Sequence, residues 1–138
     1  IRINTDKIVY IDDYAHHPSE LNALIQQAGL KYGNFCLVFQ PHRISRFTTF
    51  YAQFREVLKN VEPLVILPVY SAGEKMEGAD SEMMYRDLKE MGSEVYYFDS
   101  VEKAADFIVE NSEKLYVHSF VAAGAGDVNH VFAKLEGK

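Results

Sequence analysis

The stretch FCLVFQPHRISRFTTFYAQFREVL, residues 35–58, carries the pattern that decides the fold. It begins with a short apolar run, Phe35 to Gln40, which has the length and composition of a buried β-strand. A polar turn follows, and apolar residues then recur at helical spacing from Phe47 to Leu58. The stretch therefore predicts a strand, a loop and one long helix, which is the repeating unit of an α/β sheet.

The same alternation continues along the rest of the chain. Further strand-like runs occupy residues 7–11, 64–69, 94–98 and 115–122, and helical spacing recurs at 21–28, 101–108 and 128–135. Residues typical of helix ends support these boundaries: Pro18 in a first turn, Ser81 and Ser100 as N-caps, and Gly29 and Gly92 after helix ends.

We predict a single Rossmann-like, three-layer α/β domain over residues 1–138, with a mostly parallel six-stranded sheet and helices on both faces. The segment Ile1 to Asn4 is joined to the next strand by Thr5 and Asp6 alone. So short a connection predicts that this segment pairs antiparallel, at the edge of the sheet.

Composition excludes several classes of function. The formal charge of -6 argues against a protein that holds nucleic acid by broad neutralisation of phosphates. The sequence contains neither a long apolar run nor a basic leader, so we expect no membrane span and a cytoplasmic location. The single cysteine, Cys36, lies within an apolar strand and is predicted to be a buried thiol.

The unusual residues follow the predicted strands. They are Asp12 to Pro18, Gln40 to Arg46, Tyr70 to Glu74 with Gly78 to Ser81, and Gly124 to Asp127. In a parallel sheet every strand-to-helix loop leaves the same edge, and ligands bind there. The four loops therefore predict one composite site.

Arg43 and Arg46 are three residues apart at the expected start of a helix, so their side chains can share one face beside backbone N–H groups. Two planar guanidinium groups suit a carboxylate or a phosphate through paired hydrogen bonds. The alternative is a pair of solvated surface arginines. The position after a strand and beside His42 favours the anion receptor.

Two other loops allow more than one interpretation. The cluster of Asp12, Asp13, His16 and His17 can contact a nucleotide or substrate, serve as a structural loop, or hold a metal, although it lacks the spacing of a metal motif. The glycines Gly124 and Gly126 allow close approach of the backbone to a ligand, or simply form a tight turn. Because no third glycine and no later acidic residue complete a dinucleotide motif, we do not expect NAD.

Taken in order, these loops resemble the C-terminal domain of the Mur ligase family. The matching motifs are Asp12 to Pro18, Gln40 to Arg46, Ala72 to Glu74 with Gly78 to Ser81, and Gly124 to Asp127. Within the family, Gln40-Pro41-His42-Arg43 favours the member that joins L-alanine to UDP-N-acetylmuramate over the murein-peptide recycling ligase. Ile44 departs from the pattern, because the family usually carries an aromatic residue at this position.

The resemblance implies a three-domain, ATP-dependent ligase of peptidoglycan precursor synthesis, in which this chain is the lid and closes over an acyl-phosphate intermediate. The UDP-sugar domain and the P-loop domain that holds most of the Mg²⁺ and ATP phosphate contacts would be other parts of the enzyme, because no P-loop occurs here. We therefore expect no catalytic residue in this chain and no activity from it alone. The other function classes considered are a stand-alone nucleotide-binding or regulatory module and a metal hydrolase.

The resemblance also assigns roles to individual residues. It implies that Asp13 faces the ATP ribose and that Tyr14 and His16 line the cleft on the ATP side. It places the carboxylate of the incoming L-alanine on His42, Arg43 and Arg46. Gly124 and Gly126 would lie beside the substrates.

Overall fold

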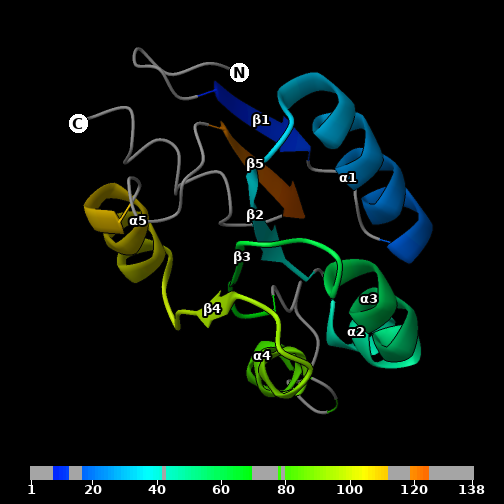
Figure 1. Ribbon diagram of the computed structural model, residues 1–138. Coiled ribbons are helices and arrows are strands. Elements are labelled where there is room, and N and C mark those ends of the chain that lie inside the picture. The colour runs from blue at the N-terminus through cyan, green and yellow to red at the C-terminus, as the bar shows by residue number, and fades with distance from the viewer. Residues whose placement is uncertain are drawn as a thin grey trace.

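A computed structural model describes residues 8–12, 17–41, 43–69, 78, 80–111 and 119–124. Within them, five strands form one parallel sheet (Figure 1). They are β1 (Ile8–Asp12), β2 (Cys36–Gln40), β3 (Leu64–Ile66), β4 (Val95–Tyr97) and β5 (Ser119–Gly124). Their order across the sheet is β1-β5-β2-β3-β4. The predicted α/β fold with a parallel sheet is confirmed, whereas the proposed antiparallel sixth strand, Ile1 to Asn4, falls outside the described residues.

In the described residues, five helices connect these strands. They are α1 (Pro18–Tyr32), α2 (Ile44–Thr49), α3 (Tyr51–Leu58), α4 (Ser81–Glu90) and α5 (Val101–Asn111). Pro18 occupies the first turn of α1, and the Ser100 hydroxyl accepts the Lys103 N–H at 3.2 Å before α5, as the sequence predicts. The helix expected at residues 128–135 lies outside the described part of the chain.

The helices lie on both faces of the sheet. Moving from β1 through β2 and β3 to β4, the chain advances in one direction across the sheet, and it then returns to β5. Since such crossovers are right-handed, the returning helix α5 must cover the opposite face from α1, α3 and α4. Two neighbours on β4 confirm this: the Tyr97 ring packs on Tyr85 of α4, while the Tyr96 ring packs on Phe107 of α5.

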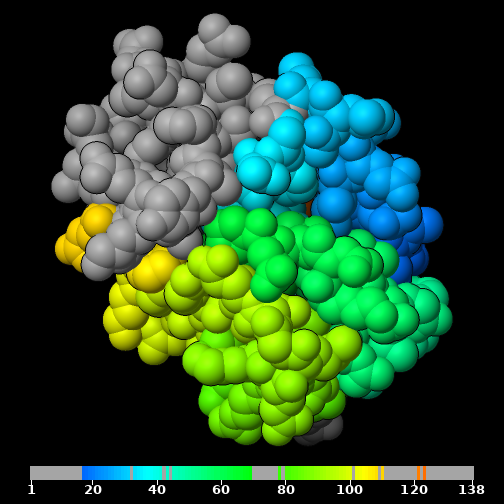
Figure 2. Space-filling view, viewed as in Figure 1, coloured from blue at the N-terminus to red at the C-terminus, as the bar shows by residue number. Residues whose placement is uncertain are grey.

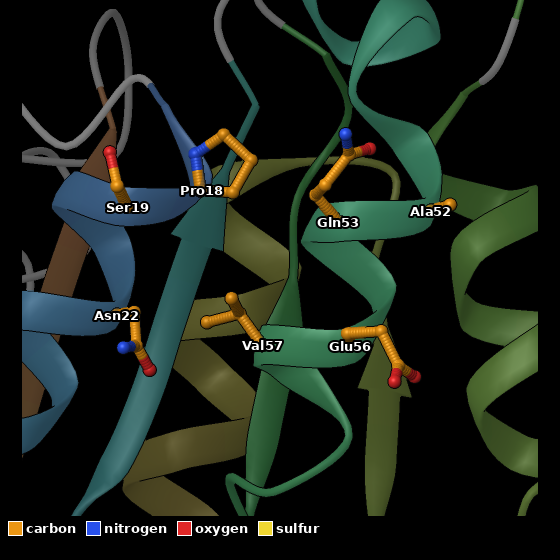
Figure 3. Close-up of a pocket in the computed structure, with 7 residues that line it drawn as sticks. All are labelled: Pro18, Ser19, Asn22, Ala52, Gln53, Glu56 and Val57. Atoms are coloured by element: carbon orange, nitrogen blue, oxygen red, sulfur yellow. The ribbon is translucent and has the colours of Figure 1, made fainter.

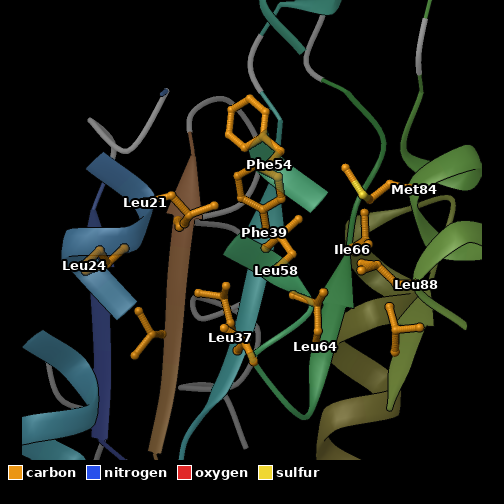
Figure 4. Packing of buried hydrophobic residues seen from close by; sticks show 14 of the residues in the cluster. Leu21, Leu24, Leu37, Phe39, Phe54, Leu58, Leu64, Ile66, Met84 and Leu88 are labelled. Atoms are coloured by element: carbon orange, nitrogen blue, oxygen red, sulfur yellow. The ribbon is translucent and has the colours of Figure 1, made fainter. Parts of the chain in front are cut away.

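The main core lies between the sheet and α1, α3 and α4 (Figure 4). Parallel pairing places Leu37 beside Leu64, and Phe39 beside Ile66, so alternate residues of adjacent strands point to the same face. Phe54 of α3 covers Phe39, with ring centroids 5.6 Å apart. The alternate residues of β2 and β3, which point to the other face of the sheet, are buried as well. Burial on both faces explains why these two strands are nearly continuous apolar runs and do not alternate with polar residues.

The single cysteine, Cys36, is fully buried in β2, as expected for a structural thiol. Burial raises the pKa of this thiol far above its ordinary value. Its sulfur is therefore not a candidate nucleophile.

Two of the helix boundaries differ from the sequence prediction. Ser81 is not the N-cap of α4, because Asp80 accepts the Met83 N–H at 2.9 Å while the buried Ser81 hydroxyl donates to the Leu67 carbonyl at 2.5 Å. Gly29 does not end α1. The helix continues to Tyr32 and stops at Gly33, whose φ of 72° glycine adopts readily.

The long apolar stripe of residues 47–58 belongs to two helices rather than one. Phe50 separates α2 from α3 with a φ of -107° and a ψ of 21°. Its N–H still donates to the Arg46 carbonyl at 3.1 Å, and its own carbonyl accepts the Phe54 N–H at 2.9 Å. The periodicity therefore survives the break, which is why the apolar pattern alone does not reveal it.

Candidate functional site

The ends of β1, β5 and β2 lie level at one edge of the sheet. Asp12 pairs with Ala123, and Gln40 pairs with Gly124, so the three strands finish within one residue of one another. Because β5 lies between β1 and β2, the carboxyl ends of these three strands lie side by side at the same edge. The sequence predicts the composite site at this edge.

An open cavity lies beside this edge at α2. It has a volume of about 400 Å³ and is lined by Arg43, Ser45, Arg46, Thr49 and Phe50. Arg43 is exposed and Arg46 half-buried. The structure thus brings the two predicted arginines to one cavity, where their guanidinium groups and two hydroxyl side chains suit an anion such as a carboxylate.

The backbone at Arg43 is unusual. This residue has a φ of 66°, a left-handed value that costs a non-glycine residue conformational energy. Its carbonyl accepts the Phe47 N–H at 3.1 Å and so begins α2. Non-glycine residues in such conformations are concentrated at ligand sites, which adds support to the cavity as the candidate site.

The residue before α1 contacts one of the residues that line this cavity. The ring of His17 packs edge-to-face on the ring of Phe50, with centroids 5.4 Å apart and an angle of 78° between the planes. His17 is the N-cap residue of α1, and its backbone N–H donates to the Glu20 carboxylate at 3.0 Å. The N-cap residue of α1 is therefore in aromatic contact with Phe50, which lines the arginine cavity.

Gly78, which precedes α4, lies close to α2. Gly78 has a φ of 126°, and a Cβ atom at this position would collide with the Thr48 hydroxyl. Only glycine combines this backbone conformation with so close an approach. Gly78, which belongs to one of the four sequence motifs, therefore lies directly against Thr48 of α2.

Gln40 has a role that sequence reasoning did not identify. Its side chain is almost fully buried at the end of β2, and its Nε2 donates to the Pro68 carbonyl at 3.1 Å. Its Oε1 accepts no hydrogen bond from the residues that the structure describes. The bond ties the end of β2 to the segment that follows β3, and the signal for it was a polar residue that closes an otherwise apolar run.

A second polar contact fixes α3 against α4. The Tyr51 hydroxyl donates to the Asp87 carboxylate at 2.5 Å, and the Arg55 guanidinium lies 3.7 Å from the same carboxylate. Burial, followed by the hydrogen bond to Asp87, raises the pKa of Tyr51. The periodicity of α3 and α4 gives no sign of this pairing, because the partners are 36 residues apart in the chain.

Another cavity, of about 390 Å³, lies between α1 and α3 (Figure 3). These two helices meet on the surface, where the blue and teal segments adjoin (Figure 2). The residues that line this cavity are Pro18, Ser19, Asn22, Ala52, Gln53, Glu56 and Val57. It contains no cationic side chain, so it is a poorer candidate than the arginine cavity for binding an anion.

Several predicted site residues lie outside the described part of the chain: Asp13, Tyr14, His16, His42 and Gly126. Gly124 is the last residue of β5, at the edge predicted for it. Among the residues that the structure describes, no three His, Cys, Asp or Glu side chains cluster in a way that could hold a metal ion. No helix in this described part is long and apolar enough to cross a membrane.

The chain belongs to the family of the Mur ligase, glutamate ligase domain, whose sequence model matches residues 1–126. Among its relatives are proteins named UDP-N-acetylmuramate–L-alanine ligase. The relative from Carboxydothermus hydrogenoformans is 38% identical over 93% of this chain, and the relative from Synechococcus sp. is 34% identical over 91%. The chain spans 28% of the length of each of these two relatives.

Solved structures show the same fold. A domain described as that of a UDP-N-acetylmuramate:L-alanyl-γ-D-glutamyl-meso-diaminopimelate ligase from Haemophilus ducreyi matches with a TM-score of 0.66 at 17% identity, over 96% of this chain and 90% of that one. The folylpolyglutamate synthase/dihydrofolate synthase of Yersinia pestis, complexed with AMPPNP and Mn, matches with a TM-score of 0.60 at 18% identity. That match covers 98% of this chain and 30% of the synthase.

Proposed function

We propose that this chain is the C-terminal domain of the ATP-dependent ligase that joins L-alanine to UDP-N-acetylmuramate in peptidoglycan precursor synthesis. Membership of the family and the shared name of relatives that are 34% to 38% identical support this assignment. The UDP-sugar domain and the P-loop ATPase domain would make up other parts of the enzyme, since the relatives are more than three times as long as this chain.

The observation that carries the proposal is the arginine cavity. The amino-acid substrate of such a ligase must be held by its carboxylate while its amine remains available to react. Arg43, the N-cap residue of α2, and Arg46, within that helix, line one cavity, and an arginine can donate two parallel hydrogen bonds to a carboxylate. We assign the L-alanine carboxylate to these arginines, together with the neighbouring His42.

In the proposed reaction the muramate carboxylate takes the γ-phosphoryl group of ATP, and the L-alanine amine then attacks the resulting acyl phosphate and displaces phosphate. An acyl phosphate is lost to hydrolysis if water reaches it. This domain would bind the amino acid, orient its amine toward the reacting carbon and close over the intermediate as a lid. These roles are positioning and exclusion of water, and we assign no proton transfer to residues of this chain.

The nucleotide side of the proposal concerns other residues. Asp13, Tyr14 and His16 are assigned to the ATP ribose and the cleft beside it, and Gly124 and Gly126 to backbone contacts with the substrates. The described residues offer a cationic cavity that suits an anion but no cluster of metal-binding side chains. Because no P-loop occurs in this sequence, we assign Mg²⁺, which would neutralise charge on the ATP phosphates when bound, mainly to the rest of the enzyme.

The experiment that tests the proposal is phosphate release by the complete enzyme with defined substrates. Release should require ATP, UDP-N-acetylmuramate and L-alanine together, and mass spectrometry should show UDP-N-acetylmuramoyl-L-alanine. If L-alanine gave no product while a murein tripeptide did, the enzyme would be the recycling ligase. Binding of ATP without any amide product would instead indicate a nucleotide-binding module.

A further inference from the structure

We propose that His17 is a positioning residue for the amino-acid cavity: its ring holds Phe50, a wall of the cavity that contains Arg43 and Arg46. This inference rests on the proposed function. By its place in the sequence, His17 adjoins the loop assigned to ATP, whereas its contact in the structure lies on the amino-acid side. The residue therefore connects the two halves of the site.

The backbone of His17 is fixed in two ways. Its N–H donates to the Glu20 carboxylate at 3.0 Å, and its carbonyl accepts the Leu21 N–H at 2.9 Å as the first bond of α1. Leu21 is fully buried, so α1 is anchored in the core where it begins. The imidazole consequently projects from a rigid support, although the side chain itself is exposed.

Phe50 is the residue on which this support acts. It lies at the break between α2 and α3, where its ring is half-buried and lines the cavity. Its N–H donates to the Arg46 carbonyl at 3.1 Å, so a shift of Phe50 is transmitted directly to the backbone of an arginine. An edge-to-face pair at 5.4 Å is an attractive arrangement that depends on both rings.

The ring of His17, and not its nitrogen atoms, is the part that acts on Phe50. A phenylalanine at position 17 can make the same edge-to-face contact, whereas an asparagine keeps a polar side chain but has no ring. If an imidazole nitrogen instead bound ATP or the intermediate, phenylalanine would be the harmful substitution. The two variants therefore separate positioning from direct contact with a ligand.

The test is steady-state kinetics of the complete ligase with His17→Asn, His17→Phe, Phe50→Leu and the double variant His17→Asn/Phe50→Leu. We expect His17→Asn to raise the KM for L-alanine about two- to tenfold, as for the loss of one aromatic pair. His17→Phe should restore the KM, the KM for ATP should not change, and the double variant should be no worse than Phe50→Leu. The control Tyr85→Leu removes a ring contact between α4 and β4 and should leave the KM for L-alanine unchanged.

Four results would count against the inference. Equal loss in His17→Phe and His17→Asn with a raised ATP KM would assign the imidazole to the nucleotide. Additive effects in the double variant would show that the two rings act independently. A fall in kcat without a change in KM would show that His17→Asn only lowers the fraction of folded enzyme, and an unchanged KM in every variant would remove the role.

Failure of the proposed function would look different. If Arg43→Ala also left the KM for L-alanine unchanged, the cavity would not be the amino-acid site at all. If Arg43→Ala raised that KM and His17→Asn did not, only the positioning role would be lost.

Discussion

The charge on Arg43 should contribute measurably to the use of L-alanine, and Arg43→Ala tests this in the complete ligase. Arg43 is exposed and lies in an open cavity, whereas Arg46 is half-buried. A hydrogen bond to a charged group contributes about 1.5 to 3 kcal/mol, and solvent weakens an exposed contact. We therefore expect Arg43 to lie toward the lower end of this range and Arg46 toward the upper end.

These free energies correspond to a loss of about 10- to 150-fold in kcat/KM for L-alanine, since each 1.36 kcal/mol is tenfold. Arg43→Ala should therefore cost about tenfold, and Arg46→Ala more. Arg43→Lys should recover part of the loss, because an ammonium keeps the charge but not the planar pair of donors. The KM for ATP should change much less than the KM for L-alanine.

The left-handed backbone at Arg43 provides a matched pair of variants. Alanine at a φ of 66° retains a conformational cost of about 1 to 2 kcal/mol, and glycine removes it. Arg43→Gly and Arg43→Ala should therefore differ in melting temperature but show the same loss in kcat/KM. Arg86→Ala, on the exposed surface of α4, is the control for the change in net charge.

The assay is phosphate release at saturating ATP and UDP-N-acetylmuramate over a range of L-alanine concentrations. An unchanged KM for L-alanine with a raised KM for ATP would make the arginine pair a phosphate receptor and overturn the assignment. A loss in Arg43→Ala that Arg43→Gly restores would trace the effect to the backbone instead of the guanidinium group.

Other predictions concern the chain itself. The 138-residue chain should release no phosphate from ATP and should bind ATP no more tightly than about millimolar, since the P-loop is assigned elsewhere; micromolar affinity by calorimetry would contradict this division of the site. Ser81→Ala should lower the free energy of unfolding by about 1 to 3 kcal/mol in urea melts, because it leaves the Leu67 carbonyl buried without its donor, while the exposed Ser19→Ala should have little effect. Because the folded-state pKa of Tyr51 is raised, its hydrogen bond to Asp87 stabilises the fold fully below about pH 10, the ordinary phenol pKa, and this stabilisation is lost as pH rises further. Tyr51→Phe should accordingly weaken the alkaline loss of stability followed by circular dichroism, and an unchanged pH profile would show that the bond is not formed in solution.

Local patterns predict the elements of this fold well, because each depends on residues close together in the chain. The apolar runs around Leu37 and Leu64 predict β2 and β3, and the spacing of apolar residues predicts α1 and α5. The ends of helices are harder to predict from the sequence, since a serine at the start of a helix can act as its N-cap or can bury its hydroxyl in another contact. Ser81 does the latter, and the neighbouring Asp80 is the cap.

The candidate site divides in the same way. Arg43 and Arg46 are three residues apart in the chain, and this spacing was enough to predict that they share one site. The break at Phe50 could not be predicted, because the apolar periodicity continues through it. The role of Gln40 depends on Pro68, which lies 28 residues away along the chain.

The sequence by itself determined the class of fold and the family to which the chain belongs, because each follows from short-range patterns or from motifs in a set order. Only the tertiary structure decided that β5 lies between β1 and β2, and that the ring of His17 packs on Phe50. An apolar run indicates that a strand is buried, but it does not indicate which strand lies beside it. That choice depends on how all the helices and strands pack at once, and the same packing places His17 against Phe50, which lines the arginine cavity.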